Sequence, residues 1–394
     1  MADIFEGVRI VDMTQNAMCQ CASAFSDFGA EVIHIERPAG GGERTYYPMI
    51  DGKPGGYLWF GRGRKSLTLN TKHPEAIKIV KDLVKDADIF IESSIPGAMD
   101  RNGLGYDDLI KINPKLVYIS ISAFGSQGPM AHKPGYDTLG QAMSGRWAVT
   151  GEKGGVPLKD GNTIADFTGA FCAYSAGVTA LYHAQRTGEG QHVEVSLVGS
   201  MFYFNSTFDR LNDGVNIKPN GNHHSGCCPF GGFENGKGDM IVICAPQPKP
   251  WANLCRAMNR EDLIDDEKYN TNNKRCQHQD EVIELIESWL ATFPTIEDAI
   301  KVLDANDVPY GQVLDNEQIL HNEQMIANHL WEDAPTPNGY SEPTFRARSP
   351  FAKFSKTPGY IHKTALLGEN NHEIMSELGY SDEEIERLQK EFAQ

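Results

Sequence analysis

Residues 8–36 read VRIVDMTQNAMCQCASAFSDFGAEVIHIE, and their pattern indicates the fold class. It contains an apolar strand over residues 8–12, a helix over 21–28 that ends at Gly29, and a second strand over 31–36. The alternation continues with a helix that opens at residue 74 and with strands over 88–92 and 116–121. Strands separated by helices of this length predict an α/β fold with a parallel, doubly wound, Rossmann-like sheet.

A second, smaller α/β region is predicted further along the chain. The most apolar helix spans residues 166–186, and a strand over 192–197 follows it. Beyond about residue 200 the sequence becomes rich in Asn, Gly, His and Pro, which is typical of a linker. A strand over 239–244 and several helices come next, and then a Pro-rich connector over 331–364. The tail over 371–391 is predicted to be helical and is strongly acidic.

Composition and charge exclude several classes of protein. The net charge of −17 argues against nucleic acid and anionic membranes as partners. No apolar run approaches the ~18 residues that a membrane span requires, and the N-terminus lacks the basic and apolar regions of a signal peptide. We therefore expect a cytoplasmic enzyme. Residues 1–101 carry 12 basic against 14 acidic side chains, and residues 281–394 carry 8 against 21, so an anionic ligand is best tolerated in the N-terminal part.

The eight cysteines show no Cys-x-x-Cys pair, so no metal site is predicted. In a chain of 394 residues they are expected to be free thiols, mostly in the core. The adjacent Cys227 and Cys228 are either plain packing residues or a reactive pair, and packing is the favoured interpretation.

A nicotinamide-dependent enzyme is the first alternative to weigh, because Glu36 stands where a ribose-binding acid would. The turn after the first strand, residues 12–17, lacks the Gly-x-Gly-x-x-Gly pattern, however. Its second glycine normally lets the backbone approach a pyrophosphate, so the absence argues against that mode of binding.

Basic residues are concentrated in loops that we expect near the carboxyl ends of strands. Open α/β sheets bind ligands at that edge, where Arg and Lys can hold phosphates through charge-assisted hydrogen bonds. For any single residue a solvated surface charge is the simpler interpretation. The residues are Arg37, Arg62, Arg64, Lys65 and Arg101.

Asp166 stands at the start of the small-residue helix. One interpretation is a helix N-cap, for which aspartate is a favoured residue. The other is a nucleophile, because a carboxylate at a helix N-terminus faces backbone N–H groups and can be held ionised there. Gly169 would let a ligand approach the backbone. The local sequence alone favours the cap.

A series of motifs occurs in a fixed order along nearly the whole chain: Phe5 to Asp12, Gly29 to Glu36, Pro134 to Asp137, Gln141 to Gly145, Ala165-Asp166, Leu181 to His183, Arg186 to Gln191, and Leu378 to Ile385. Taken together, these motifs resemble those of the class III CoA-transferases, nearest the L-carnitine/crotonobetainyl, bile-acid and 2-hydroxyacid members.

The resemblance implies that Asp166 is the nucleophile and that CoA is a substrate, with no permanently bound cofactor. Asp166 would attack the acyl-CoA thioester to give a mixed anhydride, and the released thiolate would then form an aspartyl-CoA thioester. The acceptor acid would take CoA by the reverse sequence. Because each intermediate keeps an activated acyl bond, no ATP is needed, but water must be excluded.

The resemblance also assigns binding residues. Arg37 and Arg101 match arginines that hold the CoA phosphates, and Arg64 with Lys65 matches a basic pair near the adenine. Tyr136 corresponds to an active-site tyrosine. Two further pairs are expected near the acyl group: Asn16 with Ala17, where the family's usual Ala-Gly-Pro is replaced, and Gly231 with Gly232, as a flexible glycine loop that stabilises oxyanions.

Two other functions compete with CoA transfer. An α-methylacyl-CoA racemase shares the fold but pairs the aspartate with a histidine where this chain has Tyr136. Tyrosine, with a pKa of about 10, suits proton exchange poorly at neutral pH. A non-catalytic CoA-binding protein is the other alternative, and Asp166 in its full context argues against it.

The resemblance finally implies an interlocked homodimer and a domain plan. The large domain would comprise residues 1–197 completed by 365–394, and the small domain 223–312, with linkers over 198–222 and 313–364. Linkers of such length suit interlocked chains. We expect the substrates to be a 2- or 3-hydroxy acid and its enoyl-CoA partner.

Overall fold

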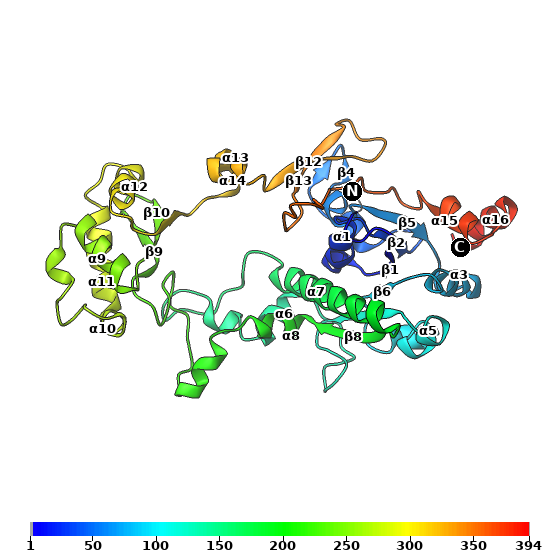
Figure 1. The fold of residues 1–394 in the computed structure, drawn as a ribbon, viewed down its shortest axis with the longest axis horizontal. Coiled ribbons are helices and arrows are strands. Elements are labelled where there is room, and N and C mark those ends of the chain that lie inside the picture. Colours follow the sequence, from blue (N-terminus) through cyan, green and yellow to red (C-terminus); the bar gives the residue numbers. More distant parts are fainter. Residues whose placement is uncertain (1–2, 394) are drawn as a thin grey trace. The chain divides into compact units, whose positions relative to one another are not determined.

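The computed structural model describes residues 3–393, which form two compact units. The first unit combines the chain up to residue 146 with residues 160–205 and the chain from 328 onward, and the second combines 147–159 with 206–327. Figure 1 labels the elements of both. These boundaries differ from the predicted domain plan. Residues 147–159, predicted in the large domain, belong to the second unit, and the longest part of the predicted linkers, residues 328–364, belongs to the first unit. That segment contains the antiparallel hairpin of β12 (Trp331–Pro335) and β13 (Thr344–Arg348), which packs against Trp59 of the first unit.

The first unit is built on a six-stranded parallel sheet in the order β5-β2-β1-β6-β7-β8, which confirms the predicted doubly wound fold. The order reverses between β1 and β6, and open sheets bind ligands outside the carboxyl ends of the strands at such a switch point. The strands are β1 (Arg9–Met13), β2 (Glu31–Glu36), β5 (Arg64–Thr68), β6 (Ile89–Glu92), β7 (Val117–Ser122) and β8 (Gln191–Ser196).

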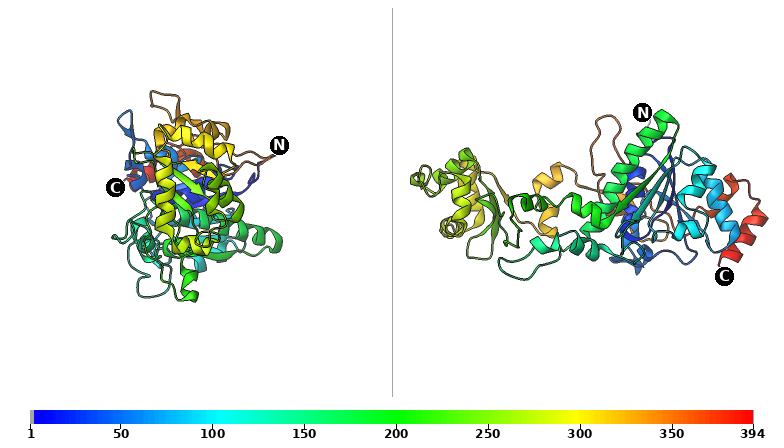
Figure 2. Two further views of the ribbon diagram at one scale, coloured as in Figure 1. Left: turned by 90° about the vertical axis from the view of Figure 1, so that its left-hand side faces the viewer. Right: turned by 90° about the horizontal axis from the view of Figure 1, so that it is seen from below.

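Helices cover both faces of this sheet, as the right-hand view of Figure 2 shows. Alternate strand residues feed two cores, because side chains along a strand point to opposite faces: Ile10 and Val32 pack into one core, Val11 and Ile33 into the other. The first core contains residues of α1 (Gln20–Ser26) and α7 (Ile164–Thr187). The second contains residues of α3 (Pro74–Val84), α5 (Tyr106–Ile112), α15 (Asn371–Glu377) and α16 (Asp382–Phe392).

Short elements complete the first unit. The C-terminal tail, predicted as helical over 371–391, is two helices, because Gly379 adopts a left-handed φ of +89° and Ser381 caps α16 in a capping box with Glu384. The other short elements are β3 (Met49–Ile50), β4 (Lys53–Pro54), α2 (Gly56–Phe60), α4 (Ala98–Arg101), α6 (Asp137–Met143) and α8 (Leu197–Tyr203).

Helix α7 is the central helix of the first core. Its length and composition would suffice for a membrane span, which the sequence analysis did not anticipate. Yet Ala170, Ala173 and Leu181 are buried in the core beside the sheet. A buried core helix can have the same length and composition as a membrane span. A Cβ on Gly177 would lie 2.7 Å from Ile119 Cδ1, so the small residues of α7 allow a close approach to the sheet.

The second unit has an antiparallel sheet in the order β11-β10-β9, formed by β9 (Phe230–Glu234), β10 (Met240–Cys244) and β11 (Tyr310–Gln312). Its core includes Trp251 and Leu254 from α9 together with Ile286 from α11. The helices are α9 (Pro248–Ala257), α10 (Asn272–Gln277), α11 (Gln279–Leu290), α12 (Ile296–Ala305), α13 (Asn316–His321) and α14 (Glu323–Ala327).

Candidate active site

A pocket of about 390 Å³ opens at the carboxyl ends of the central strands of the first unit. Its walls come from residues 15–18 after β1, from 93–96 after β6, and from the starts of α6 and α7. This is the position that the switch in strand order predicts for a ligand. The pocket brings together four of the residues named from the sequence: Asp166, Tyr136, Asn16 and Ala17.

Asp166 lies in the first turn of α7 but does not cap it. The N-cap position is Thr163, whose side chain forms no capping hydrogen bond. Instead, Asp137 Oδ1 accepts the backbone N–H groups of Ala165 at 2.7 Å and of Asp166 at 3.3 Å. The N-cap interpretation of Asp166 is therefore wrong, because the carboxylate of Asp137 in α6 accepts the N–H groups at the start of the helix. The Asp166 side chain is left half-buried at the pocket wall.

The electrostatics of Asp166 differ from the expectation that the helix N-terminus holds it ionised. Burial, and then the charge of Asp137, raise the pKa of Asp166 to about 7. The carboxyl group is thus protonated for part of the time at neutral pH. A poorly solvated carboxylate of this basicity is a stronger nucleophile than an ordinary aspartate.

The charge of Asp137 can be tested through the pH dependence of the reaction. Asp137→Asn keeps an oxygen that can accept the N–H of Ala165 but removes the negative charge. The acid limb of kcat/KM, which reports the free enzyme, should fall near pH 7 in the wild type and move to lower pH in the variant. It should stay above the ordinary aspartate range, because burial is the larger cause. The exposed Asp107→Asn is the control, and an unmoved limb in Asp137→Asn would contradict this account.

Tyr46 is a site residue that the sequence analysis missed. It lines the pocket, and its hydroxyl donates to Asn16 Oδ1 at 2.5 Å. Burial first, then the charges of Glu43 and Asp166, raise the pKa of Tyr46. Tyr136, the residue named instead, also lines the pocket but is 71% exposed. The signal for Tyr46 lay in its place after the glycine-rich loop that follows β2.

Arg37 and Arg101 lie where the sequence placed them. Arg37 directly follows β2, and Arg101 ends the short helix α4 after β6, so both belong to segments that follow the carboxyl ends of strands. Both are exposed, and neither forms an ion pair with any residue between 3 and 393. Their role in holding CoA phosphates stays a prediction.

Arg64 and Lys65 lie at the opposite edge, because they begin β5 rather than follow it. The Arg64 side chain is fully buried, and its Nη1 lies 2.7 Å from Asp12 Oδ2. Lys65 forms ion pairs with Glu31 at 2.8 Å and Glu373 at 2.6 Å. The expectation that both lie in a loop near the carboxyl end of a strand is wrong. In this structure Arg64 has no surface to offer a CoA adenine or phosphate.

Arg62, the remaining basic residue of that segment, is also engaged within the protein. It forms a buried ion pair with Asp27 at 2.6 Å and stacks over the Trp59 ring. It precedes β5 and so lies at the amino edge as well.

Gly231 and Gly232 belong to the second unit and lie within β9, where they pair with Ile243 and Val242 of β10. The expected flexible glycine loop is therefore a strand in this structure. A Cβ on Gly231 would lie 2.3 Å from the carbonyl oxygen of Asn222, so close backbone packing accounts for this glycine. Its proposed contact with oxyanions stays untested.

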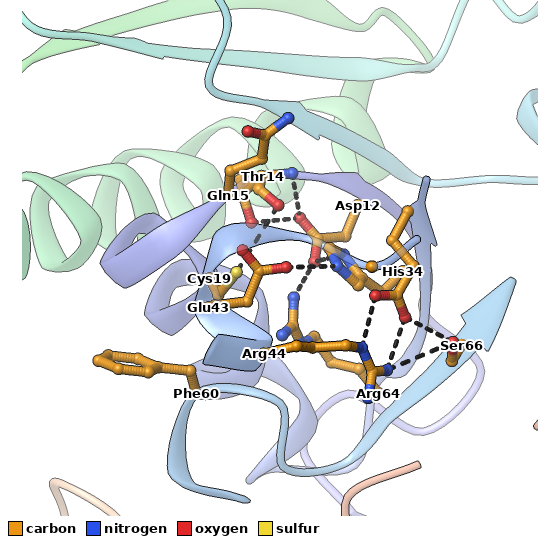
Figure 3. A network of polar contacts seen from close by, with 12 residues as sticks. Asp12, Thr14, Gln15, Cys19, His34, Glu43, Arg44, Phe60, Arg64 and Ser66 are labelled. Atoms are coloured by element: carbon orange, nitrogen blue, oxygen red, sulfur yellow. Dashed lines mark hydrogen bonds and ion pairs between the residues drawn. The ribbon is translucent and has the colours of Figure 1, made fainter. Parts of the chain in front are cut away.

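One group of possible metal ligands stands out among residues 3–393: Cys19, His34 and Glu43, whose donor atoms lie within 4.8 Å of one another. All three are buried, and Figure 3 shows them beside the Asp12–Arg64 ion pair. The buried guanidinium cation of Arg64 would repel a metal cation held by these three residues. The charges already balance if His34 is an imidazolium between Asp12 and Glu43, so we assign no metal to this group.

The cysteines in the described chain are all free, as expected. Burial raises the pKa of Cys228 to about 12, which makes this thiol a poor nucleophile at neutral pH. That favours the packing interpretation for Cys228.

Comparison with known proteins identifies the family. Residues 5–371 match CoA-transferase family III. Succinyl-CoA:glutarate CoA-transferase of Mus musculus is 32% identical over 97% of this chain and 88% of its own length. Formyl-CoA:oxalate CoA-transferase of Streptomyces avermitilis is 31% identical over 98% of each chain. The crystal structure of a CAIB/BAIF family protein from Brucella suis superposes with a TM-score of 0.82 at 27% identity, covering 96% of this chain and all of that one.

These relatives are not specifically the carnitine, bile-acid or 2-hydroxyacid transferases that the sequence suggested as nearest. They are named as CoA-transferases, as is the succinate–glutarate CoA-transferase of Agrobacterium fabrum, 32% identical over 97% of this chain and 96% of its own length. The racemase alternative finds no support in these names. The chain is a CoA-transferase and belongs to family III.

Proposed function

We propose that this enzyme moves CoA from an acyl-CoA to a free carboxylic acid through an aspartyl-CoA thioester on Asp166. The observation that best supports this proposal is that two different aspartates serve the start of α7. Asp137 satisfies the helix N–H groups, and Asp166 keeps a basic, half-buried carboxylate on the pocket wall.

CoA transfer through Asp166 takes four successive displacements. An Asp166 oxygen attacks the thioester carbonyl, the C–S bond breaks, and a mixed anhydride and CoA thiolate result. The thiolate attacks the aspartyl carbonyl, which releases the donor acid and leaves Asp166 as a CoA thioester. The acceptor carboxylate then displaces the thiolate, and the thiolate takes the acyl group from the new anhydride. Asp166 ends as a carboxylate, with no net proton change.

We propose small di- or hydroxycarboxylic acids as the acceptors. The names of the relatives mention glutarate and oxalate, and one relative, from Chloroflexus aurantiacus, is a beta subunit of succinyl-CoA–L-malate CoA-transferase. Malate is both a dicarboxylate and a 2-hydroxy acid, so this class includes the predicted hydroxy acids. An enoyl-CoA donor remains part of the panel that tests the proposal.

The test is to trap the intermediate. The protein is incubated with succinyl-, acetyl-, formyl- and crotonyl-CoA in turn, and peptides containing Asp166 are analysed by mass spectrometry after hydroxylamine or borohydride treatment. We expect a hydroxamate or a reduced side chain at Asp166 with the true donor. The exposed Asp107 serves as the internal control. Transfer of CoA with no modification at Asp166 under any donor would refute the covalent route.

We also propose a homodimer. Exposed aromatic side chains on α7 and α8 support a further protein surface there: Phe171, Tyr182, Phe202 and Tyr203 are 49%, 61%, 44% and 81% exposed. The cytoplasmic location and the lack of nucleic-acid or membrane partners stay predictions.

A further inference from the structure

Figure 3 shows a buried chain of alternating charges formed by Arg64, Asp12, His34 and Glu43. Glu43 contacts Asn16, which lines the pocket together with Asp166. Asp12 lies on β1, His34 on β2, and Glu43 in the 3₁₀ turn over residues 42–45. We propose that His34 and Glu43 are positioning residues for CoA transfer: they hold the Asn16 backbone so that its side-chain amide faces the reacting carboxyl groups. The inference rests on the proposed function and adds to it two residues that do not line the pocket.

The contacts run in one direction, from the sheet to the pocket. His34 Nδ1 lies 2.9 Å from Asp12 Oδ2, and His34 Nε2 lies 3.8 Å from Glu43 Oε1. The other oxygen of Glu43 accepts the backbone N–H of Asn16 at 3.1 Å. The side chains of Asp12, His34 and Glu43 are each at most 1% exposed. Asn16 itself lines the pocket together with Asp166.

The positive charge of His34 is needed to balance the buried carboxylate of Glu43. Asp12 already has Arg64 as a partner at 2.7 Å, whereas Glu43 Oε1 has no hydrogen-bond partner among residues 3–393. A buried carboxylate with neither partner nor counter-charge is costly. An imidazolium at His34 supplies that charge. Burial and Arg64 lower the pKa of His34, but Asp12 and Glu43 outweigh them, so the net shift is upward.

Asn16 is held in a conformation that it would not adopt without support. Its φ of +57° lies in the left-handed region, which asparagine tolerates but does not prefer. The bond from its N–H to Glu43 holds this turn closed. The loop is shaped around the carboxylate, because a Cβ on Gly41 would lie 1.9 Å from Glu43 Oε1. Gly41 therefore has to be a glycine for Glu43 to reach Asn16.

The side chain of Asn16 is oriented as well. The Tyr46 hydroxyl donates to Asn16 Oδ1 at 2.5 Å, which leaves the two N–H bonds of Nδ2 available to a ligand in the pocket that Asn16 lines. An amide donor fixed in this way suits the oxygen that becomes negative when Asp166 attacks a thioester. Removing one such donor typically slows the reaction by about 10²–10³-fold. A donor that only loses its fixed position should cost less.

The test is an epistasis experiment on kcat. Glu43→Gln keeps the size of the side chain but removes its charge, and Asn16→Gly removes the amide while suiting the positive φ. Each single change should lower kcat by about tenfold or more with KM for acyl-CoA changed less than about threefold. Glu43→Gln should have almost no further effect in the Asn16→Gly background. Equal and additive losses in both backgrounds would overturn the proposal.

A second pair of variants covers the case in which Glu43→Gln does not fold. His34→Gln cannot carry a charge, whereas the ammonium of His34→Lys can face both Asp12 and Glu43. We expect His34→Lys to recover most of the kcat that His34→Gln loses, with equal melting temperatures. Equal kcat in the two variants would contradict a role through charge. Glu31→Gln, at the amino edge of the same sheet, is the control with unchanged kcat.

The readout separates this inference from the proposed function. Formation of the Asp166 adduct is measured in the wild type and in each variant. If the wild type forms no adduct while transferring CoA, the covalent function fails. If the wild type forms it and Glu43→Gln forms it equally fast, the function stands and the positioning role fails.

Discussion

Asp166→Asn is expected to transfer CoA at least about 10³-fold more slowly than the wild type, with acyl-CoA binding largely kept. The amide has nearly the shape of the carboxyl group but is not a nucleophile, so neither the anhydride nor the aspartyl-CoA thioester can form. The rate is measured by following acyl-CoA formation by chromatography. Asp166→Ala is run beside it, because asparagine can revert slowly to aspartate by deamidation.

The stability of Asp166→Asn distinguishes a lost nucleophile from a damaged fold. The pKa of Asp166 is raised from 3.8 to about 7 on folding, so the folded state holds this proton more tightly than the unfolded state. The wild type therefore loses stability from this group as pH rises from about 4 to about 7. The amide has no proton to lose, so the melting temperature of Asp166→Asn should exceed that of the wild type more at pH 8 than at pH 5. A variant that is inactive and also less stable at pH 8 would contradict this assignment.

Arg64→Met is expected to destabilise the protein by about 3–5 kcal/mol, because it leaves the carboxylate of a fully buried ion pair without its arginine partner. The Arg64 guanidinium and the Asp12 carboxylate are both 0% exposed and lie 2.7 Å apart. Methionine fills much of the volume but leaves Asp12 with only His34 as a charged partner. Urea-induced unfolding, followed by circular dichroism, gives the free energy of unfolding.

The neighbouring residue provides a matched control. Lys65→Met breaks two ion pairs whose side chains are partly exposed, so it should cost at most about 1 kcal/mol. If Arg64 instead contacted CoA, as the sequence suggested, Arg64→Met would raise KM for acyl-CoA and leave stability nearly unchanged. Arg37→Met is expected to show that second pattern.

Much of the fold was predictable because its signals are local. The strands over 8–12 and 31–36 and the helix over 166–186 are continuous apolar or periodic segments, and β1, β2 and α7 occupy nearly the same residues. The pocket at the carboxyl edge follows from strand order, which the β-α-β alternation implies. The edge on which a charged residue lies was harder to assign. The loop that contains Arg62 ends directly before β5, so Arg64 and Lys65 are the first two residues of that strand.

The doubly wound sheet, the family and the importance of Asp166 were all evident in the sequence, since each depends on a short-range pattern or on motifs read in order. The environment of the Asp166 carboxyl group, by contrast, depends on contacts that only the folded chain makes. Asp137 meets the first turn of α7 from 29 residues away, and Asp12 meets His34 and Arg64 across 22 and 52 residues. The pKa of a carboxyl group depends on burial and on such neighbours, which no local pattern encodes. A helix cap and a nucleophile look alike in sequence, and they separate only when the fold shows which carboxylate receives the helix N–H groups.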